Sequence, residues 1–587
     1  MRNFLLGALV GALLVFFVVP LFGLLIWAAS RGGQPPVPSD TALEISLRGD
    51  VPEHADMDWT DLLQMGDRRS PIDLYTLTEA IRFAAEDEKI KALVLRGGGS
   101  QAGWAKAQET RWAIQEFKKS GKPVWAYLEI AGREDYYIAS LADKVVLQPE
   151  SYLDLKGLRL EVMFYKGTLE KLGVEVELIR TGKYKSAGEP FTREEISPEW
   201  RTVLDQTLDE FYGQLLSGIA DGRGRDAQHW GTVLDEGPFT SGEAQMHGLI
   251  DDVLYRDAFF DQLNEAASVE DLSRLSVADY ARRALPNQRQ GEKIAIMHAI
   301  GPITSRSAWS GPFGPGTQIL DAQRFIPALE KLRKDESIAG VVLRIDSPGG
   351  EAIASEQMLR AVRQLAEEKP LVVSMSTLAA SGGYYIASAP DVPIVAYPGT
   401  YTGSIGVFTL MFKLHDLYEK LGITKEILTR GRFAAIDSDY ESMSGAEREK
   451  LREYVDSIYD TFLARVAEGR GLDIESVQEL AQGRVWIGSQ ALDNGLVDEL
   501  GGYREAIAQV KKEADIDEDS PVQIVSYPPQ QSMIQSLLSP GGQSAGSQLL
   551  EVPILGRLQQ VWIDAGGWAP WMQGGTMFTT PYAISVD

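Results

Sequence analysis

The sequence contains no cysteine. Disulfides, thiolate metal sites and cysteine nucleophiles are therefore excluded, but the compartment is not settled, because a protein from an oxidising compartment need not contain cysteine. Basic residues are also few, since 57 Lys and Arg stand against 83 Asp and Glu, which gives a net charge of −26. This excess of acid disfavours nucleic acid and other polyanionic partners, and it weakly disfavours an acyl-CoA substrate.

Several common catalytic patterns are missing as well. The sequence has no GxSxG nucleophile elbow and no SxxK motif. No metal-binding constellation or phosphate-binding loop is visible, so we expect no metal and no cofactor. Five histidines occur, and none lies in the motifs described below: His54, His229, His247, His298 and His415.

The chain begins with one long stretch that carries no charge. Residues 3–30 contain no charged side chain, and a helix over residues 4–29 would be about 39 Å long, enough to cross a hydrocarbon core of ~30 Å. A cleaved signal peptide is the alternative, but the apolar run is longer than the usual core of roughly 7–15 residues. We expect residues 1–30 to be a cytoplasmic stub and a transmembrane anchor, with the bulk of the chain outside.

Most of the remaining chain is an internal duplication. IKALVLR, ending at Arg96, recurs as IAGVVLR, ending at Arg344, and DYYIAS recurs as GYYIAS. The two arginines keep the same spacing as Tyr137 and Tyr385, which is 248 residues (344 − 96 and 385 − 137). The sequence therefore predicts two large copies of one domain.

Strands and helices alternate within each copy. The ALVLR and GVVLR strands follow helical patterns at residues 74–85 and 323–332, and the strands at 123–128 and 370–375 precede helical YYIAS segments. This alternation predicts an α/β fold with largely parallel strands. The expected order is the anchor at 1–30, a linker at 31–40, an N-terminal repeat at 41–266, a connector at 267–290, a C-terminal repeat at 291–519 and a tail of unknown role at 520–587. For the tail we favour a surface segment over contact with lipid or another subunit through its tryptophans.

The two copies differ at the residues that are suited to catalysis. Ser381, in AASGGYYIAS, lies opposite Arg133 in the first copy. Lys185, in GKYKSAGEPF, lies opposite Ala434 in the second copy. Each copy thus keeps one plausible catalytic group and lacks the other, so a serine and a lysine from different copies would together make one composite site.

Ser381 is suited to be a nucleophile. It follows an apolar strand and precedes two glycines, so we expect its hydroxyl on a tight turn at the start of a helix. The amide of Gly382, and that of Gly350 left free at the start of the helix after SPGG, could both point at the oxygen of an attacked carbonyl. Alternatively, ASGG and SPGG are only strand–helix turns, in which glycine is common.

Lys185 is the candidate base. A serine hydroxyl needs a base, and a lysine can serve if burial lowers its pKa from ~10.4 toward ~7. A lone lysine is more commonly a solvated surface charge. Ser404, in YTGSIG, could hold the amine toward Ser381, or it could only stabilise a turn.

The combined motifs RIDSPGG, AASGGYYIAS, YTGSIG and KYKSAGEPF resemble the S49 serine peptidases, in particular the double-length bacterial form of the signal peptide peptidase A group. The resemblance extends from the anchor to about residue 520. It implies a Clp-protease/crotonase-like fold duplicated in tandem and a homotetramer, held in the bacterial inner membrane by a single span with its catalytic body in the periplasm. The implied activity is cleavage of hydrophobic peptides, namely the signal peptides that remain in the membrane after secretion.

The same resemblance assigns roles to individual residues. It implies that Ser381 is the nucleophile, Lys185 the general base and Ser404 the residue that orients the lysine, with Gly350 and Gly382 as oxyanion donors. Two other functions stay open. A crotonase-type acyl-CoA enzyme shares glycine-based oxyanion holes but needs no serine after the strand, and a catalytically inactive membrane scaffold leaves the complementary serine and lysine unexplained.

Overall fold

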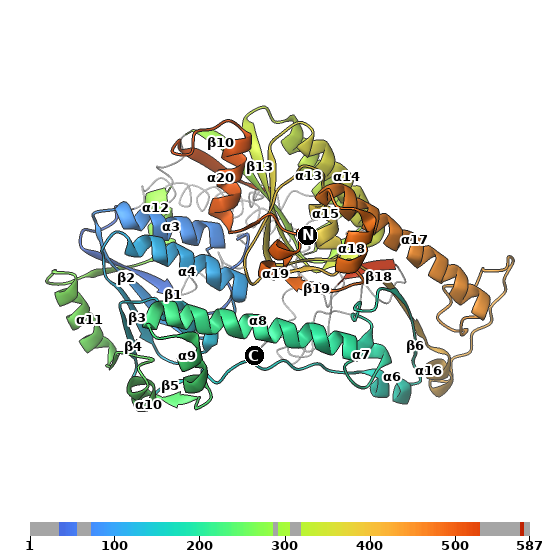
Figure 1. The fold of residues 1–587 in the computed structure, drawn as a ribbon, viewed down its shortest axis with the longest axis horizontal. Helices are drawn as coiled ribbons and strands as arrows, with labels where there is room; N and C mark the ends of the chain where they lie inside the picture. Colours follow the sequence, from blue (N-terminus) through green and yellow to red (C-terminus); the bar gives the residue numbers. More distant parts are fainter. Residues whose placement is uncertain (1–34, 56–71, 286–290, 306–318, 529–575, 580–587) are drawn as a thin grey trace, which may run out of the picture.

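The computed structural model describes residues 35–55, 72–285, 291–305, 319–528 and 576–579 (Figure 1). The predicted anchor in residues 1–30 lies outside this part of the chain. Within the described ranges, no helix combines the length and the apolar character that a membrane crossing requires.

The first copy is built on a six-stranded sheet in the order β8-β4-β3-β2-β1-β9, and every pair in it is parallel. Its central strands are almost wholly buried and rich in Val, Leu and Ala, as expected for a parallel sheet covered on both faces. The strands are β1 (Thr41–Ser46), β2 (Ile90–Gly97), β3 (Val124–Leu128), β4 (Lys144–Leu147), β8 (Asp252–Val253) and β9 (Ser273–Ser276).

The second copy repeats this plan in a sheet whose main path is β19-β17-β15-β13-β10-β21, with β16 and β20 joined at β15. All its pairs are parallel except β17 with β19. The predicted duplication and the largely parallel α/β fold are therefore confirmed. The strands are β10 (Glu292–Ile300), β13 (Ile338–Ser347), β15 (Leu371–Ala380), β16 (Ile394–Ala396), β17 (Tyr401–Gly403), β19 (Val485–Ile487), β20 (Glu499–Leu500) and β21 (Val522–Tyr527).

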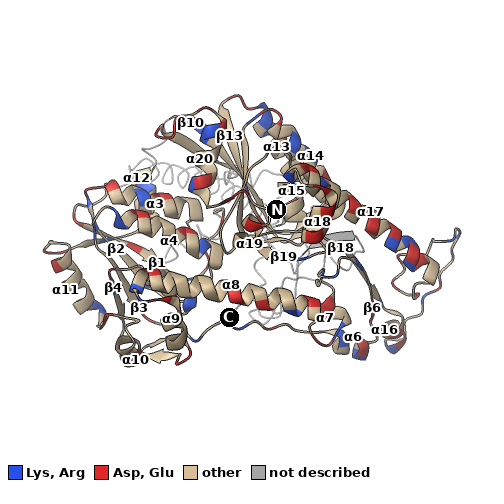
Figure 2. Ribbon diagram, viewed as in Figure 1, with Lys and Arg blue, Asp and Glu red and all other residues tan. Residues whose placement is uncertain are grey.

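Helices of the two copies correspond in pairs. In the first copy these are α3 (Leu74–Glu86), α4 (Trp104–Lys118), α5 (Arg133–Ala139) and α8 (Pro198–Arg223), and in the second they are α13 (Ala322–Lys334), α14 (Ala352–Ala366), α15 (Gly382–Ala387) and α17 (Gly445–Arg470). The long helices α8 and α17 each begin at a serine whose hydroxyl accepts a backbone N–H of the first turn, Ser197 and Ser444. Charges of both signs alternate along α17 (Figure 2).

The remaining elements of both copies are short. They are α9 (Ala227–Leu234), α10 (Ser241–Met246), α11 (Arg256–Ala266), α12 (Val277–Ala284), α18 (Ile474–Leu480), α19 (Gly488–Asp493), α20 (Tyr503–Glu513) and the pair β5 (Tyr152–Leu153) and β7 (Phe239–Thr240). Two edge strands fall outside the expected repeats. β9 lies in the predicted connector and pairs with β1, and β21 lies in the predicted tail and pairs with β10. Each sheet therefore takes its last strand from the chain that follows the expected repeat.

A third sheet joins the two copies. Its order is β12-β11-β14-β22-β18-β6, and β6 of the first copy pairs antiparallel with β18 of the second over their whole lengths. Its members are β6 (Glu175–Thr181), β11 (Ile303–Thr304), β12 (Leu320–Asp321), β14 (Gly349–Glu351), β18 (Val407–Lys413) and β22 (Thr576–Thr579), flanked by α6 (Lys166–Leu172), α7 (Glu189–Thr192) and α16 (His415–Lys420). Figure 1 shows β6, β18 and α16 together at one end of the molecule.

A buried ion pair also ties the copies together. Glu53, in the segment after β1, accepts hydrogen bonds from Arg344 of β13 at 2.8 and 3.1 Å. Both side chains are almost inaccessible to solvent. Tyr503 donates to the same carboxylate at 2.8 Å, and Tyr397 accepts from the guanidinium at 3.1 Å. The centre of this contact is therefore satisfied by hydrogen bonds, as buried charges require.

Candidate active site

The pairing of β6 with β18 places Lys185 of the first copy beside Ser404 of the second copy. In the β6–β18 ladder Thr181 lies opposite Val407, and the chain turns just beyond it so that Lys185 reaches Ser404, three residues before β18. The turn is held by Arg180, whose guanidinium donates to the Lys185 carbonyl at 2.8 Å. The lysine is 1% exposed, so the alternative of a solvated surface charge does not apply.

The Lys185 amine has three oxygen neighbours. Its Nζ lies 2.7 Å from Ser381 Oγ, 2.9 Å from the Ser404 carbonyl oxygen and 3.1 Å from Ser404 Oγ. The structure thus brings together the serine, the lysine and the second serine that the sequence singled out. The Ser404 carbonyl is an additional contact that no side-chain pattern could have indicated.

The backbone at Ser381 holds an unusual conformation. Ser381 caps the N-terminus of α15 with φ 56° and ψ −115°, a region that residues other than glycine rarely adopt. Its amide donates to the Gly403 carbonyl at 2.7 Å, and its carbonyl accepts from the Tyr385 amide at 2.8 Å. These bonds fix a strained turn that presents the hydroxyl to Lys185, as the strand–serine–helix pattern predicted.

Burial changes the proton affinity of Lys185. Removal from water disfavours the ammonium form and lowers the pKa of Lys185 well below its ordinary value. A neutral amine can accept the hydroxyl proton of Ser381 across the 2.7 Å hydrogen bond. The pair can therefore perform nucleophilic chemistry without a histidine.

The two predicted oxyanion glycines lie next to each other. A β-carbon placed on Gly382 would lie 3.0 Å from the amide nitrogen of Gly350. Gly350 does not open the next helix as expected, because it pairs within β14 and α14 begins at Ala352. A β-carbon at Gly350 would lie 2.0 Å from the Ile303 carbonyl oxygen, so the packing of β14 against β11 requires glycine there.

In the first copy, a carboxylate fills the corresponding place. Asp135, which lies opposite Gly383 in the repeat, accepts the amides of Gly99, Ser100 and Gly132 at 2.8–2.9 Å. The loop after β2 is thus closed by the protein's own side chain. Sequence reasoning missed this role, although the change from DYYIAS to GYYIAS was its signal.

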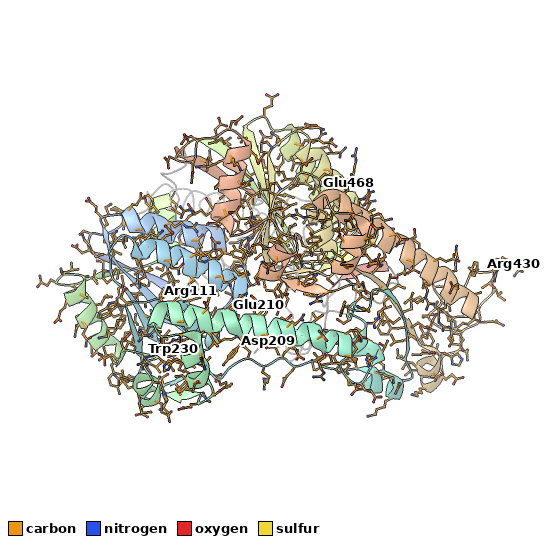
Figure 3. The ribbon with its side chains drawn as sticks, in the orientation of Figure 1. Arg111, Asp209, Glu210, Trp230, Arg430 and Glu468 are labelled. Atoms are coloured by element: carbon orange, nitrogen blue, oxygen red, sulfur yellow. The ribbon has the colours of Figure 1, made fainter. Side chains whose placement is uncertain are left out.

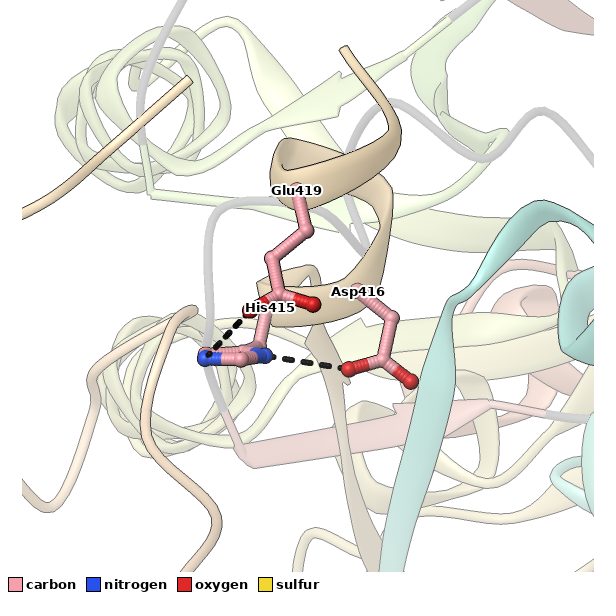
Figure 4. A group of neighbouring side chains, drawn as sticks. All are labelled: His415, Asp416 and Glu419. Carbon is pink, nitrogen blue, oxygen red and sulfur yellow. Dashed lines mark hydrogen bonds and ion pairs between the residues drawn. The ribbon is translucent and has the colours of Figure 1, made fainter. Parts of the chain in front are cut away.

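Two other polar clusters lie apart from these residues. His415, Asp416 and Glu419 gather on α16 with their ligand atoms within 4.8 Å of one another, but Asp416 and Glu419 are exposed, and such surface groups are common without a metal (Figure 4). A surface hollow of about 530 Å³ is bordered by Asp209 and Glu210 of α8, labelled in Figure 3, and by Trp486. Ser381 lines neither.

Comparison with known proteins shows to which family the two copies belong. Residues 116–270 and 363–517 each match the model of peptidase family S49. The chain is 34% identical over 513 residues to the chloroplastic serine protease SPPA of Arabidopsis thaliana, covering 86% of this chain and 74% of that protein. It is 31% identical over 561 residues to Protease 4 of Haemophilus influenzae, covering 91% and 90% of the two chains. Protease 4 of Salmonella typhi is 32% identical over 462 residues, covering 76% and 72%. The chain therefore belongs to peptidase family S49, as a serine peptidase that carries the family domain twice.

Proposed function

We propose that this protein is a membrane-anchored endopeptidase with a Ser381–Lys185 dyad that degrades signal peptides after their release from secreted proteins. The observation that carries the proposal is the 2.7 Å hydrogen bond between Lys185 Nζ and Ser381 Oγ, made by a fully buried lysine. The uncharged run at residues 3–30 supports a membrane anchor. The resemblance described above adds the rest of this proposal: the membrane is the bacterial inner membrane, the catalytic body lies in the periplasm, and each copy has a Clp-protease/crotonase-like arrangement.

The mechanism follows from this geometry. Lys185 takes the hydroxyl proton as Ser381 Oγ bonds to the peptide carbonyl carbon, and the developing oxyanion accepts the amides of Gly350 and Gly382. The tetrahedral intermediate collapses, the peptide C–N bond breaks, and the Lys185 ammonium returns its proton to the leaving amine. A water molecule then repeats the addition on the acyl-enzyme, again with Lys185 as base, and releases the acid and free Ser381.

Fluorophosphonate labelling tests the dyad. Wild-type protein should form an adduct on Ser381, and both Ser381→Ala and Lys185→Ala should lose labelling and peptide cleavage. The double variant should be no worse than either single variant, because nucleophile and base act as one unit. Arg133→Ala, at the matching place in the first copy, is the control and should keep nearly normal activity. Normal turnover in either dyad variant would refute the assignment, and absence of any Ser381 adduct would mean that Ser381 is not the nucleophile of this peptidase.

The substrate class needs a separate comparison. Detergent-solubilised protein should cleave a synthetic signal peptide faster, in kcat/KM, than a charged hydrophilic peptide of equal length. Equal kcat/KM values for the two peptides would contradict a preference for signal peptides but would leave the peptidase assignment intact.

We also propose that the chain forms a homotetramer through a repeat of its own internal contact. Residues 424–430 correspond to β6 at a spacing of 249 residues, lie outside any strand and expose 88% of Leu428. Figure 3 shows Arg430, the last residue of this segment, at the outer tip of the molecule. A second copy could pair with this segment as β18 pairs with β6. Light scattering should give four subunits for the wild type and fewer for Leu428→Asp, whereas an unchanged mass for Leu428→Asp would exclude this contact.

A further inference from the structure

The two strands that lead to Gly350 and Ser381 run side by side, but their pairing is interrupted just before both residues. The last pair before the interruption and the first pair after it are Ile345 with Met375 and Ser347 with Ala379. One residue of β13, Asp346, therefore faces residues 376–378 of β15, which form a bulge. The way in which this bulge is held sets how Gly350 and Ser381 lie relative to each other.

Asp346 spans the bulge with its side chain. Its carboxylate Oδ1 accepts the backbone amide of Leu378 at 3.1 Å, and its own carbonyl oxygen accepts the amide of Gly301 at 2.9 Å. Leu378 precedes Ser381 by three residues, and Asp346 precedes Gly350 by four. The carboxylate thus ties the end of the strand that leads to the nucleophile to the end of the strand that leads to the oxyanion donor.

The first copy, which has no serine at this place, also lacks the aspartate. Gly98 lies opposite Asp346 at the repeat spacing of 248 residues. A β-carbon on Gly98 would lie 1.7 Å from the Ile130 carbonyl oxygen, so the two strand ends approach each other directly there. The second copy also has one more residue between the paired strand and Ser381, since 381 − 375 is 6 and 133 − 128 is 5. The bulge and the aspartate occur together in the copy that carries the serine.

Charged groups from both copies surround the Asp346 carboxylate. Removal from water and the nearby Glu53 carboxylate raise the pKa of Asp346 to about 6, while Lys106 and Arg344 favour its ionised form. Lys106 comes from α4 of the first copy, where its Nζ lies 3.1 Å from Asp50 and 2.8 Å from the carbonyl oxygen of the next residue. The charge state of Asp346 therefore depends on the contact between the copies.

Two histidines adjoin the same cluster. His54 follows Glu53 in the chain, and its ring lies 4.7 Å from the ring of His298. His298 in turn lies opposite Arg344 in the pairing of β10 with β13. Because histidine is the side chain that ordinarily changes charge near neutral pH, a variant without His54 is a necessary control for any pH dependence assigned to Asp346.

We propose that Asp346 is a positioning residue that fixes Ser381 relative to the Gly350 amide, and that Lys106 of the first copy supports its ionised form. The inference depends on the proposed Ser381–Lys185 dyad. An ionised carboxylate is a stronger acceptor for the Leu378 amide than a neutral group is. The first copy thus supplies two residues to the site, one as the base and one as a distant charge.

Two substitutions of Asp346 test the hydrogen bond to Leu378. Asp346→Asn keeps an oxygen acceptor of the same size without the charge, so kcat should fall about three- to tenfold with KM nearly unchanged. Asp346→Ala removes the acceptor, so kcat should fall roughly 30-fold or more. Fluorophosphonate labelling of Ser381 should slow in the same order. Wild-type values of kcat and labelling rate in the asparagine variant, which preserves the shape of the site, would overturn the inference, and so would a rise in KM alone.

The pH dependence is a readout that a merely structural role would not produce. Lys185 is common to wild type and Asp346→Asn, so its titration cancels in the ratio of their kcat/KM values. This ratio should fall toward 1 as the pH drops through about 6, because a protonated aspartate is uncharged, as asparagine is. The fall should persist when both proteins also carry His54→Gln. A ratio that stays constant between about pH 5 and 8, or a fall that disappears with His54→Gln, would contradict the inference.

Lys106→Met tests the contribution of the first copy. Loss of this cation should move the midpoint of the fall to higher pH, because Lys106 favours the ionised aspartate. Lys119→Met, which changes a 72% exposed lysine just after α4, is the control and should leave the midpoint in place. Equal midpoints in the two lysine variants would refute the role of Lys106. If wild type forms no Ser381 adduct at any pH, the proposed dyad fails, whereas equal labelling of wild type and both Asp346 variants refutes this inference alone.

Discussion

The amine of Lys185 sits among three oxygen atoms, all from serines of the other copy. An ammonium could donate one proton to each, but burial disfavours that charged state. The neutral amine donates two hydrogen bonds and keeps a lone pair for the Ser381 hydroxyl. This geometry fits the proposed roles, in which Ser404 orients the amine and Ser381 is the group that the amine activates.

Activity should depend on pH through the protonation state of Lys185. In the proposed mechanism the neutral amine of Lys185 is the base, so kcat/KM should rise with pH through the lowered pKa of Lys185 and then reach a plateau below the ordinary lysine value. A pH profile of kcat/KM, paired with the pH dependence of Ser381 labelling, measures this. If the labelling rate of the Lys185→Ala variant still rose with pH over the same range, another group would be the base.

Burial of Lys185 should also cost stability. The folded pKa lies below the unfolded value, so between the two the unfolded state binds more protons and stability rises with pH. Lys185→Met, which fills similar space without a charge, should therefore have a higher Tm than wild type at pH 7. The difference should shrink as the pH approaches 10.5. Thermal unfolding at several pH values tests this, and a lower Tm for Lys185→Met at pH 7 would contradict it.

Ser404→Ala should weaken catalysis without abolishing it. The substitution removes the 3.1 Å contact to Lys185 but leaves the Ser404 carbonyl at 2.9 Å. One lost hydrogen bond of about 1 kcal/mol corresponds to a drop in kcat of roughly five- to tenfold. Steady-state kinetics should show this drop with KM nearly unchanged, and a loss as complete as that of Lys185→Ala would mean that Ser404 does more than orient the amine.

How far the sequence predicts the site is clearest for single residues. Ser381 and Lys185 could be found because the repeat exposes each as a position where the copies disagree. The Asp135 carboxylate that closes the first copy was not found, because its role depends on three backbone amides that carry no sequence signal. The Ser404 carbonyl escaped for the same reason.

The pairing of β6 with β18 fixes the position of Lys185 through the turn that follows β6. Arg180, the penultimate residue of β6, donates both to the Lys185 carbonyl at 2.8 Å and to Glu189 at 2.9 Å, and Glu189 is 1% exposed. Arg448 of α17 also pairs with Glu177 of β6 from the second copy. Arg180 therefore holds the turn that carries Lys185, and Arg448 holds the strand that leads into it.

Arg180→Ala should loosen the turn after β6. It leaves a buried carboxylate and a carbonyl without this donor, so the free energy of unfolding should fall by about 1–3 kcal/mol, and kcat should fall with it. Arg193→Ala is the matched control, since Arg193 is 3.9 Å from the same Glu189 and 40% exposed, and it should change stability by less than about 1 kcal/mol. Urea unfolding and kcat measure both. If the two variants behaved alike, the turn would not depend on Arg180.

Local periodicity predicted the helices and parallel strands within each copy, but not the sheet between the copies. β6 and β18 lie more than 200 residues apart in the sequence, and neither segment contains a local pattern that indicates its partner. The same limit applies to Gly350. The SPGG motif suggested that a helix starts at Gly350. In the structure Gly350 instead lies in β14, where it pairs with Ile303 of β11. A bulky residue at Gly350 would therefore displace β14 as well as the backbone amide that we propose as an oxyanion donor.

The Glu53–Arg344 pair links the two copies through a buried contact. Burial alone would raise the pKa of Glu53, but the Arg344 guanidinium lowers it to about 2. The stabilisation is therefore complete above the ordinary glutamate pKa of 4.5 and is lost as the pH falls toward 2. The pair should act as an acid-sensitive clasp between the copies.

Glu53→Ala tests this clasp. An unpaired buried guanidinium should reduce stability by about 3–5 kcal/mol at pH 7. The penalty should fade at acid pH, where the wild type loses the same interaction. Glu453→Ala, which breaks an exposed pair with Lys450, is the control and should cost at most about 0.5 kcal/mol. Chemical unfolding at pH 7 and near pH 3 compares them, and equal losses for the two variants would refute the clasp.

The composite site also sets the moment at which the protein becomes a protease. Ser381 is synthesised 196 residues after Lys185, and neither has a catalytic partner within its own copy. If the proposed dyad holds, a growing chain that has completed only its first copy has the base but not the serine that the base activates. Hydrolysis by this dyad thus requires contact between the two copies, so a product of translation that stops within the first copy should cleave no peptides.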